Sequence, residues 1–177
     1  MSGSTQLDLK QYIRDIPDFP KPGILFRDIT PLLSNTAALR EMVDRMAAPF
    51  RNRGIDVIAA AEARGFIFAA PMALTLGVGF VPIRKPGKLP FQTQGFEYEL
   101  EYGKDKLEMH ADGIGRGEQV LLVDDLLATG GTIDACCRLV EQVGAQVVAC
   151  AFAIELRGLG GAKRIAPREI FSVIKYD

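Results

Sequence analysis

The chain lacks a long hydrophobic run, an excess of charge of one sign, and most of the side chains that bind zinc. Its longest apolar run, Phe66–Leu74, has nine residues and contains Pro71, whereas a membrane-spanning helix needs about 20. The 21 Lys and Arg residues are balanced by 22 Asp and Glu residues, for a net charge of −1. Because general nucleic-acid binders are strongly basic, this balance argues against that class. We therefore expect neither a membrane nor a nucleic acid among the partners.

Histidine and cysteine are scarce, with one histidine, His110, and three cysteines. No C-x-x-C pair occurs, so a tetrahedral zinc site is not expected. Cys136 and Cys137 fall within an apolar helical pattern, which predicts that they pack in the core, and His110 is expected to end a strand. The odd cysteine count and an N-terminus without an apolar signal core favour a cytoplasmic location.

The length of 177 residues and the ordinary composition are typical of one domain. Apolar residues between Leu39 and Phe50 recur at helical spacing, and Asn35 or Thr36 could cap that helix. A second helix is predicted over 133–140, with Gly144 as its stop. Short apolar runs predict buried strands at Val57–Ala61, Gly79–Ile83, Val120–Val123 and Val147–Ile154.

The alternation of strands and helices predicts an α/β fold, in which an open, mostly parallel sheet is flanked by helices on both faces. Residues 96–102 alternate apolar and acidic side chains instead, which is typical of a half-exposed antiparallel hairpin. We expect the turn of this hairpin at Gly103–Asp105. The predicted organisation is a single domain over 1–177, with a small N-terminal hood at about 1–33 and a flap at about 90–110.

The segment Val120–Thr132 carries the strongest chemical signal. An apolar strand ends at Asp124 and Asp125, and a small-residue loop, Ala128-Thr129-Gly130-Gly131-Thr132, then opens a helix. The two glycines let backbone N–H groups approach an anion, the threonines add hydroxyl donors, and the helix N-terminus favours negative charge. The loop is therefore predicted to bind a phosphate.

Asp124 and Asp125 cannot bind that phosphate themselves, because like charges repel. Carboxylates at this position suit the hydroxyls of a ribose or the water molecules on Mg²⁺. A loop that joins anion donors to diol acceptors matches a 5′-phosphorylated ribose. The segment is neither a P-loop nor a Rossmann fingerprint, because both glycine patterns are missing.

This segment resembles the 5-phosphoribosyl-1-pyrophosphate (PRPP) loop of type I phosphoribosyltransferases, in the form seen in adenine phosphoribosyltransferases. The resemblance covers nearly the whole chain, through further segments at Phe26–Pro31, Glu62–Phe66, Ile83–Pro90 and Tyr98–Gly103. It implies the reaction of adenine with PRPP to give AMP and pyrophosphate, assisted by Mg²⁺, in a homodimer.

The resemblance also implies a role for each site residue. The ribose and 5′-phosphate would be bound by Asp124, Asp125 and the loop Ala128–Thr132, with Asp124 a candidate contact to Mg²⁺. Adenine would be bound by Leu25, Phe26 and Arg27, and catalysis would depend on Glu101 and Tyr102 in the flap. A cis peptide is implied near Glu62–Ala63, and Arg84 or Lys85 could act across the dimer. The pyrophosphate-binding residues would be Glu62, Ala63, Arg64, Arg84, Lys85 and Lys88.

Two other functions remain open on the residues alone. One is a phosphoribosyltransferase for another purine, of the xanthine or hypoxanthine type, because backbone recognition of a base leaves little side-chain signal. The other is a regulator that binds PRPP without catalysis, which the net charge of −1 and the short N-terminal segment disfavour. An assay of each purine base with PRPP would distinguish the three.

Overall fold

The computed structural model describes residues 6–100 and 103–177, and the chain divides into two compact units, Met1–Arg45 and Met46–Asp177. The first unit contains η1 (Leu9–Tyr12), an antiparallel pair of β1 (Arg14–Ile16) and β2 (Phe26–Asp28), and α1 (Thr30–Ser34). Helix α2 (Thr36–Ala47) follows. The Asn35 side chain accepts a hydrogen bond from the Ala38 N–H at 3.0 Å, which confirms its predicted capping role.

A buried carboxylate holds the strand pair of the first unit to α1. Asp28 accepts bonds from the Arg14 guanidinium at 2.6 and 2.9 Å, and from the backbone N–H of Thr30 at 2.9 Å. The bond from the Thr30 N–H, followed by those from Arg14, lowers the pKa of Asp28. This strand pair was not predicted, because its main contacts join side chains 14 residues apart.

Within the described residues, five parallel strands form the central sheet of the second unit. Their order is β4 (Gly79–Ile83), β3 (Val57–Ala61), β7 (Gln119–Leu127), β8 (Gln146–Leu156) and β9 (Ile170–Tyr176). The predicted bounds of β3 and β4 are confirmed, while β7 and β8 extend beyond the predicted runs and β9 was not predicted. The α/β fold with a parallel sheet is confirmed.

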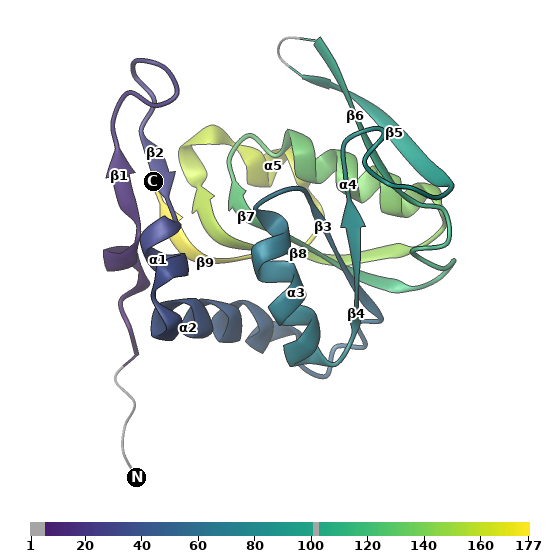
Figure 1. Cartoon of the computed structure of the whole chain (residues 1–177), viewed down its shortest axis with the longest axis horizontal. Helices are drawn as coiled ribbons and strands as arrows, with labels where there is room; N and C mark the ends of the chain where they lie inside the picture. Colours follow the sequence, from purple (N-terminus) through teal and green to yellow (C-terminus); the bar gives the residue numbers. More distant parts are fainter. Residues whose placement is uncertain (1–5, 101–102) are drawn as a thin grey trace. The chain divides into compact units, whose positions relative to one another are not determined.

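The order of the strands sets the faces on which the helices lie. Helix α3 (Gly65–Leu76) connects β3 to β4, whereas α4 (Gly131–Gln142) connects β7 to β8 in the opposite direction along the sheet. Because parallel crossovers are right-handed, α3 and α4 cover opposite faces (Figure 1). The direction changes between β3 and β7, and ligands of open α/β sheets bind at such a switch point.

The remaining connections are short. They comprise η2 (Ala48–Phe50) before β3, and η3 (Arg157–Leu159) with α5 (Gly161–Ile165) between β8 and β9. Cys136 and Cys137 of α4 are fully buried, as predicted. Gly144 has a φ of +83° just after the C-cap of α4, which confirms it as the stop of that helix.

The antiparallel hairpin consists of β5 (Thr93–Leu100) and β6 (Gly103–His110). His110 ends β6, as predicted. The predicted turn at Gly103–Asp105 is wrong, because these residues belong to β6 and Asp105 pairs with Tyr98 of β5. The physical reason is a cross-strand contact: the Tyr98 hydroxyl donates to the Asp105 carboxylate at 3.1 Å.

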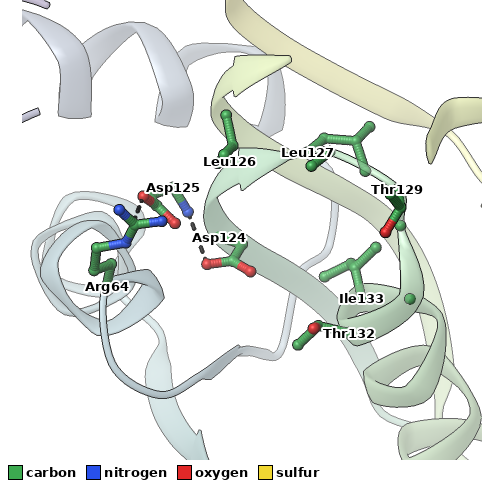
Figure 2. Close-up of a pocket in the computed structure, with 11 residues that line it drawn as sticks. Arg64, Asp124, Asp125, Leu126, Leu127, Thr129, Thr132 and Ile133 are labelled. Atoms are coloured by element: carbon green, nitrogen blue, oxygen red, sulfur yellow. Dashed lines mark hydrogen bonds and ion pairs between the residues drawn. The ribbon is translucent and has the colours of Figure 1, made fainter. Parts of the chain in front are cut away.

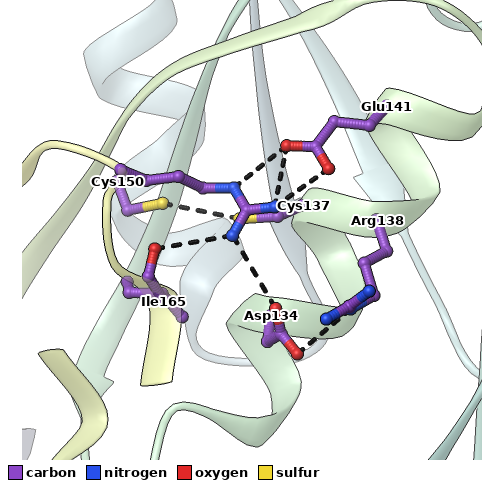
Figure 3. A network of polar contacts seen from close by, with 7 residues as sticks. Asp134, Cys137, Arg138, Glu141, Cys150 and Ile165 are labelled. Carbon is purple, nitrogen blue, oxygen red and sulfur yellow. Dashed lines mark hydrogen bonds and ion pairs between the residues drawn. The ribbon is translucent and has the colours of Figure 1, made fainter. Parts of the chain in front are cut away.

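An arginine fixes the connection that leads into β9. The guanidinium of Arg168 donates three bonds of 2.8, 2.9 and 3.0 Å to the Glu141 carboxylate near the end of α4, and one of 3.4 Å to the carbonyl of Ile165 in α5 (Figure 3). This network joins α4 to α5, on which the loop before α4 also packs. In the described ranges, no helix has the length and apolar character needed to cross a membrane.

Candidate active site

A cavity of about 230 Å³ opens where β7 ends, beside the N-terminus of α3. Its lining comprises Arg64 and the continuous segment from Asp124 to Ile133 (Figure 2). The cavity therefore lies at the switch point between β3 and β7. The structure brings together the predicted acidic pair, the predicted phosphate loop and Arg64.

A glycine allows α3 to approach the acidic pair. A Cβ atom on Gly65 would lie 3.0 Å from the Asp124 Oδ1 and 3.1 Å from the carbonyl oxygen of Val123. Both distances are tighter than nearly all real contacts of a Cβ atom, so a larger residue would push α3 away from β7. Gly65 thus places Arg64, the residue before it, at the edge of the cavity.

The phosphate loop is shaped by close backbone packing. Gly130 has a φ of +79° and precedes α4, whose first N–H groups have no acceptor within the helix. A Cβ atom on Gly161 of α5 would lie 2.3 Å from the carbonyl oxygen of Ala128. The loop therefore rests directly on the backbone of α5, and the N–H groups at the start of α4 are of the kind that suits an anion.

Burial and mutual repulsion oppose full ionisation of the acidic pair. The Asp125 Oδ2 lies 3.0 Å from the Arg64 Nε, and the Asp125 N–H donates to the Asp124 Oδ1 at 2.9 Å. Burial raises the pKa of Asp124 to about 8, and the charge of Asp125 adds to the effect. Burial also raises the pKa of Asp125, although Arg64 opposes this. Such a pair favours hydroxyl donors or a hydrated cation as its ligand.

Glu62 organises the cations that follow β4. Its carboxylate accepts from the Arg84 Nε at 2.8 Å and from the Lys85 N–H at 2.9 Å. Burial alone would raise the pKa of Glu62, but these two bonds outweigh it and the pKa is lowered. The Glu62 carboxylate thus positions the Arg84 guanidinium and the Lys85 backbone, and the predicted contact of the Glu62 turn with pyrophosphate stays a prediction.

Comparison with known proteins agrees with this geometry. Residues 31–177 match the model of the phosphoribosyl transferase domain. The adenine phosphoribosyltransferase of Rhodopirellula baltica is 60% identical over 96% of this chain and 82% of its own length. The chain belongs to the adenine phosphoribosyltransferase family.

Solved structures of the family share the fold. The crystal structure of the enzyme from Thermoanaerobacter pseudethanolicus has a TM-score of 0.92 and 53% identity, covering 95% of this chain and 98% of that one. The Saccharomyces cerevisiae enzyme, complexed with adenine and an imino-altritol bisphosphate, has a TM-score of 0.87 and 39% identity, covering 93% and 95% of the two chains.

The other residues that the family resemblance implied are placed as follows. The Glu62–Ala63 peptide is cis, as expected. Glu101 and Tyr102 lie outside the described residues, so their role stays a prediction. Lys88 is exposed, and the Lys85 ammonium forms an ion pair with the Asp105 carboxylate of the hairpin.

The predicted adenine segment lies in the first unit. Leu25 is 45% exposed, Phe26 packs edge-on against Phe19 with ring centroids 5.1 Å apart, and the Arg27 guanidinium pairs with Asp15. An exposed apolar side chain beside an aromatic ring is suited to stacking on a base. The assignment of adenine to this segment stays a prediction.

Sequence reasoning missed three contributors to the site: Gly65, Gly161 and Asp105. The glycines matter through backbone contacts with distant segments, and the Gly160-Gly161 pair gave only a weak signal of a tight approach. Asp105 was assigned to a turn, although the alternation of residues 96–102 already placed Tyr98 on the packed face of the hairpin.

Proposed function

We propose that the chain transfers the 5-phosphoribosyl group from PRPP to adenine, forming AMP and pyrophosphate. The observation that carries this proposal is the cavity at the switch point, where an acidic pair and a phosphate loop lie side by side. This combination suits a phosphorylated ribose, and the yeast relative complexed with adenine supports adenine as the acceptor.

Each side of the cavity has a distinct task in this reaction. The N–H groups of Ala128–Thr132 hold the 5′-phosphate, and the acidic pair accepts bonds from the ribose hydroxyls. Arg64 lies beside the acidic pair, where its guanidinium can reach both the ribose and a pyrophosphate group at C1. Bond breaking at C1 has oxocarbenium character, as in glycosyl transfer generally, and the cations that Glu62 positions stabilise the departing charge.

The flap would supply the proton chemistry and exclude water. Glu101 is proposed to manage the proton at the purine ring as the ring nitrogen attacks, with Tyr102 beside it. Leu25, Phe26 and Arg27 would hold the purine by stacking and by backbone bonds to its edge.

Mg²⁺ is proposed as the cofactor, bound through the substrate and water with Asp124 as the protein contact. Among residues 6–100 and 103–177, no group of three or more His, Cys, Asp or Glu side chains gathers into a metal site. Burial, followed by the charge of Asp125, raises the pKa of Asp124 although the charge of Arg64 opposes this, and a hydrated cation would stabilise the ionised carboxylate further. Bound there, Mg²⁺ would offset the charge of the pyrophosphate group.

A homodimer and a cytoplasmic location are also proposed. Ile67 and Leu74 of α3 are exposed, at 37% and 85%, and they lie one turn from Ala70 and Pro71 on the same helical face, so α3 is the candidate dimer surface. The odd number of cysteines, without a pattern of paired spacings, supports the cytoplasmic location.

The deciding experiment is a spectrophotometric assay of adenine, hypoxanthine, guanine and xanthine, each with PRPP and Mg²⁺. We expect turnover with adenine and at most traces with the other bases. Turnover with another purine in preference to adenine would overturn the base assignment. Binding of PRPP without turnover of any base would favour the regulator instead.

A further inference from the structure

Arg168 lies outside the lining of the cavity, yet it bonds the two helices against which the phosphate loop is built. Its backbone N–H and its guanidinium both donate to the Ile165 carbonyl at the end of α5, at 3.1 and 3.4 Å. The same guanidinium donates to the Glu141 carboxylate of α4 at 2.8, 2.9 and 3.0 Å (Figure 3). Arg168 is therefore fixed to the end of one helix and pairs with a charge on the other.

A further contact of Arg168 reaches the first turn of α4. Its Nη1 lies 3.8 Å from the Asp134 Oδ1, and the Arg138 Nε donates to the other oxygen of that carboxylate at 3.2 Å. Asp134 and Glu141 are separated by about 10 Å along the helix axis, because each residue adds about 1.5 Å. Contacts at two such distant points restrain the direction of α4 as well as its position.

The loop Ala128–Thr132 depends on both of these helices. A Cβ atom on Gly161 of α5 would lie 2.3 Å from the Ala128 carbonyl oxygen, and one on Gly130 would lie 2.9 Å from the Gly161 carbonyl oxygen. The last two residues of the loop form the start of α4. A shift of α4 relative to α5 would therefore distort the loop, because one part rests on α5 and the other belongs to α4.

We propose that Arg168 is a positioning residue for the 5′-phosphate, because it holds α4 and α5 in the arrangement in which the loop Ala128–Thr132 binds that group. The inference rests on the proposed function, which assigns the phosphate to this loop. The effect is confined to the phosphate end of the site, since Glu62 holds Arg84 and Lys85 through bonds that involve neither helix.

The test is the affinity for ribose 5-phosphate, measured by isothermal titration on the full chain. Arg168→Met keeps an unbranched apolar stem and removes every bond of the guanidinium. We expect binding to weaken about three- to tenfold, within the range in which residues that touch no ligand alter binding. The KM for PRPP should rise likewise, while the KM for adenine and, in the reverse reaction with AMP, the KM for pyrophosphate stay unchanged.

Arg53→Met is the matched control. Arg53 forms a pair of the same kind with Glu169, through bonds of 2.6 and 2.9 Å, but it contacts neither α4 nor α5 through them. This variant loses the same charge and should bind ribose 5-phosphate as wild type does, and circular dichroism and thermal melting establish that each variant is folded. Equal affinity of Arg168→Met and Arg53→Met would overturn the inference alone. Wild-type protein that fails to bind ribose 5-phosphate would overturn the phosphate site and the inference with it.

Glu141→Gln separates the positioning role from an effect of charge. It removes a negative charge, so an effect of charge alone would tighten the binding of a phosphate. A weaker pair with Arg168 should instead weaken binding, by less than Arg168→Met does, and should add nothing in an Arg168→Met background, where the pair is already lost. If Arg168→Met does not fold, Glu141→Gln decides, and unchanged or tighter binding in that variant would contradict the positioning role.

Discussion

The proposed phosphate loop and the proposed pyrophosphate cluster, which comprises Glu62, Arg84 and Lys85, are built in different ways. The loop Ala128–Thr132 consists of small residues, and its shape depends on the backbone of α5 pressing against it. The pyrophosphate cluster lies outside the lining of the cavity and depends on charged side chains, since Glu62 holds the Arg84 guanidinium and the Lys85 backbone. One site is thus set by steric fit and the other by charge pairing.

The difference is consistent with the chemistry that each end would undergo. The 5′-phosphate stays bound throughout the reaction, so a rigid cradle of N–H groups suits it as an anchor. The pyrophosphate group gains charge as it departs, and positioned cations stabilise that change. Four variants test this contrast, ordered from the largest expected effect to the smallest.

Gly161→Ala should disrupt the packing of the loop Ala128–Thr132 on α5. The new Cβ would lie 2.3 Å from the Ala128 carbonyl oxygen and 2.9 Å from the Leu127 Cδ1, so the loop or α5 must move. A displacement of about 1 Å can cost about a hundredfold in rate, and we expect at least that loss in kcat/KM. Gly158→Ala is the control, because its Cβ would meet no atom within 4 Å. Equal activity of the two variants would show that the contact does not shape the loop.

Glu62→Gln should weaken the ion pair that holds Arg84. The amide keeps the shape of the side chain but loses the negative charge that draws in the Arg84 guanidinium at 2.7 Å. We expect the KM for pyrophosphate, measured in the reverse reaction with AMP, to rise about three- to tenfold, because the amide oxygen still accepts a neutral hydrogen bond and only the charge is lost. Glu169→Gln removes an exposed carboxylate that pairs with Arg53 and should change nothing. A lower KM in Glu62→Gln would mean that this carboxylate competes with pyrophosphate instead.

Asp124→Asn tests the acidic pair, Asp124 and Asp125. In the folded state the pKa of Asp124 is about 8, well above its ordinary value of 3.8, so the folded protein retains a proton that the unfolded chain has released. Stability from this group is therefore lost as the pH rises from about 4 to about 8.

Asparagine does not ionise, so the variant avoids the cost of a buried negative charge. Its melting temperature should exceed that of wild type by about a few degrees at pH 8 and by less at pH 6. Asp44→Asn, which removes an exposed carboxylate on α2, should show no such trend. A constant difference across this pH range would contradict the raised pKa. The activity of Asp124→Asn should fall even as its stability rises, since the carboxylate is proposed to serve the ligand.

The elements that could be predicted are those whose burial is visible as a run of apolar residues within a short stretch of sequence. All five positions of β3 are buried, and its apolar run therefore marks both ends of the strand. In contrast, only Ser172 and Ile174 of β9 are buried, so this strand has no continuous buried run. Strands β1 and β2 are held by ion pairs between residues that are distant in sequence. No pattern within a short window indicates such contacts, and the false turn at Gly103–Asp105 has the same origin.

The same distinction, between features within one segment and contacts between distant segments, applies to the site. The loop Ala128–Thr132 and the acidic pair are adjacent in sequence, so glycine and charge within one segment indicated residues that the structure places together around one cavity. The function of Glu62 in holding Arg84, and the bond between Lys85 and Asp105, join segments about 20 residues apart. Such pairings depend on the register of β4 and the hairpin, which the sequence does not reveal.

Arg164→Met should have the smallest effect and tests how far the phosphate loop works without a cation. The Arg164 Nη1 lies 3.5 Å from the position of a Cβ on Gly131, yet the side chain is exposed. Exposed charges are screened by salt, so we expect ribose 5-phosphate to bind about twofold more weakly in dilute buffer and equally well at about 1 M salt. Lys163→Met, on the same short helix, provides the charge-matched control. A loss of tenfold or more that survives high salt would mean that Arg164 contacts the phosphate directly, and the two ends of the site would then bind anions in the same way.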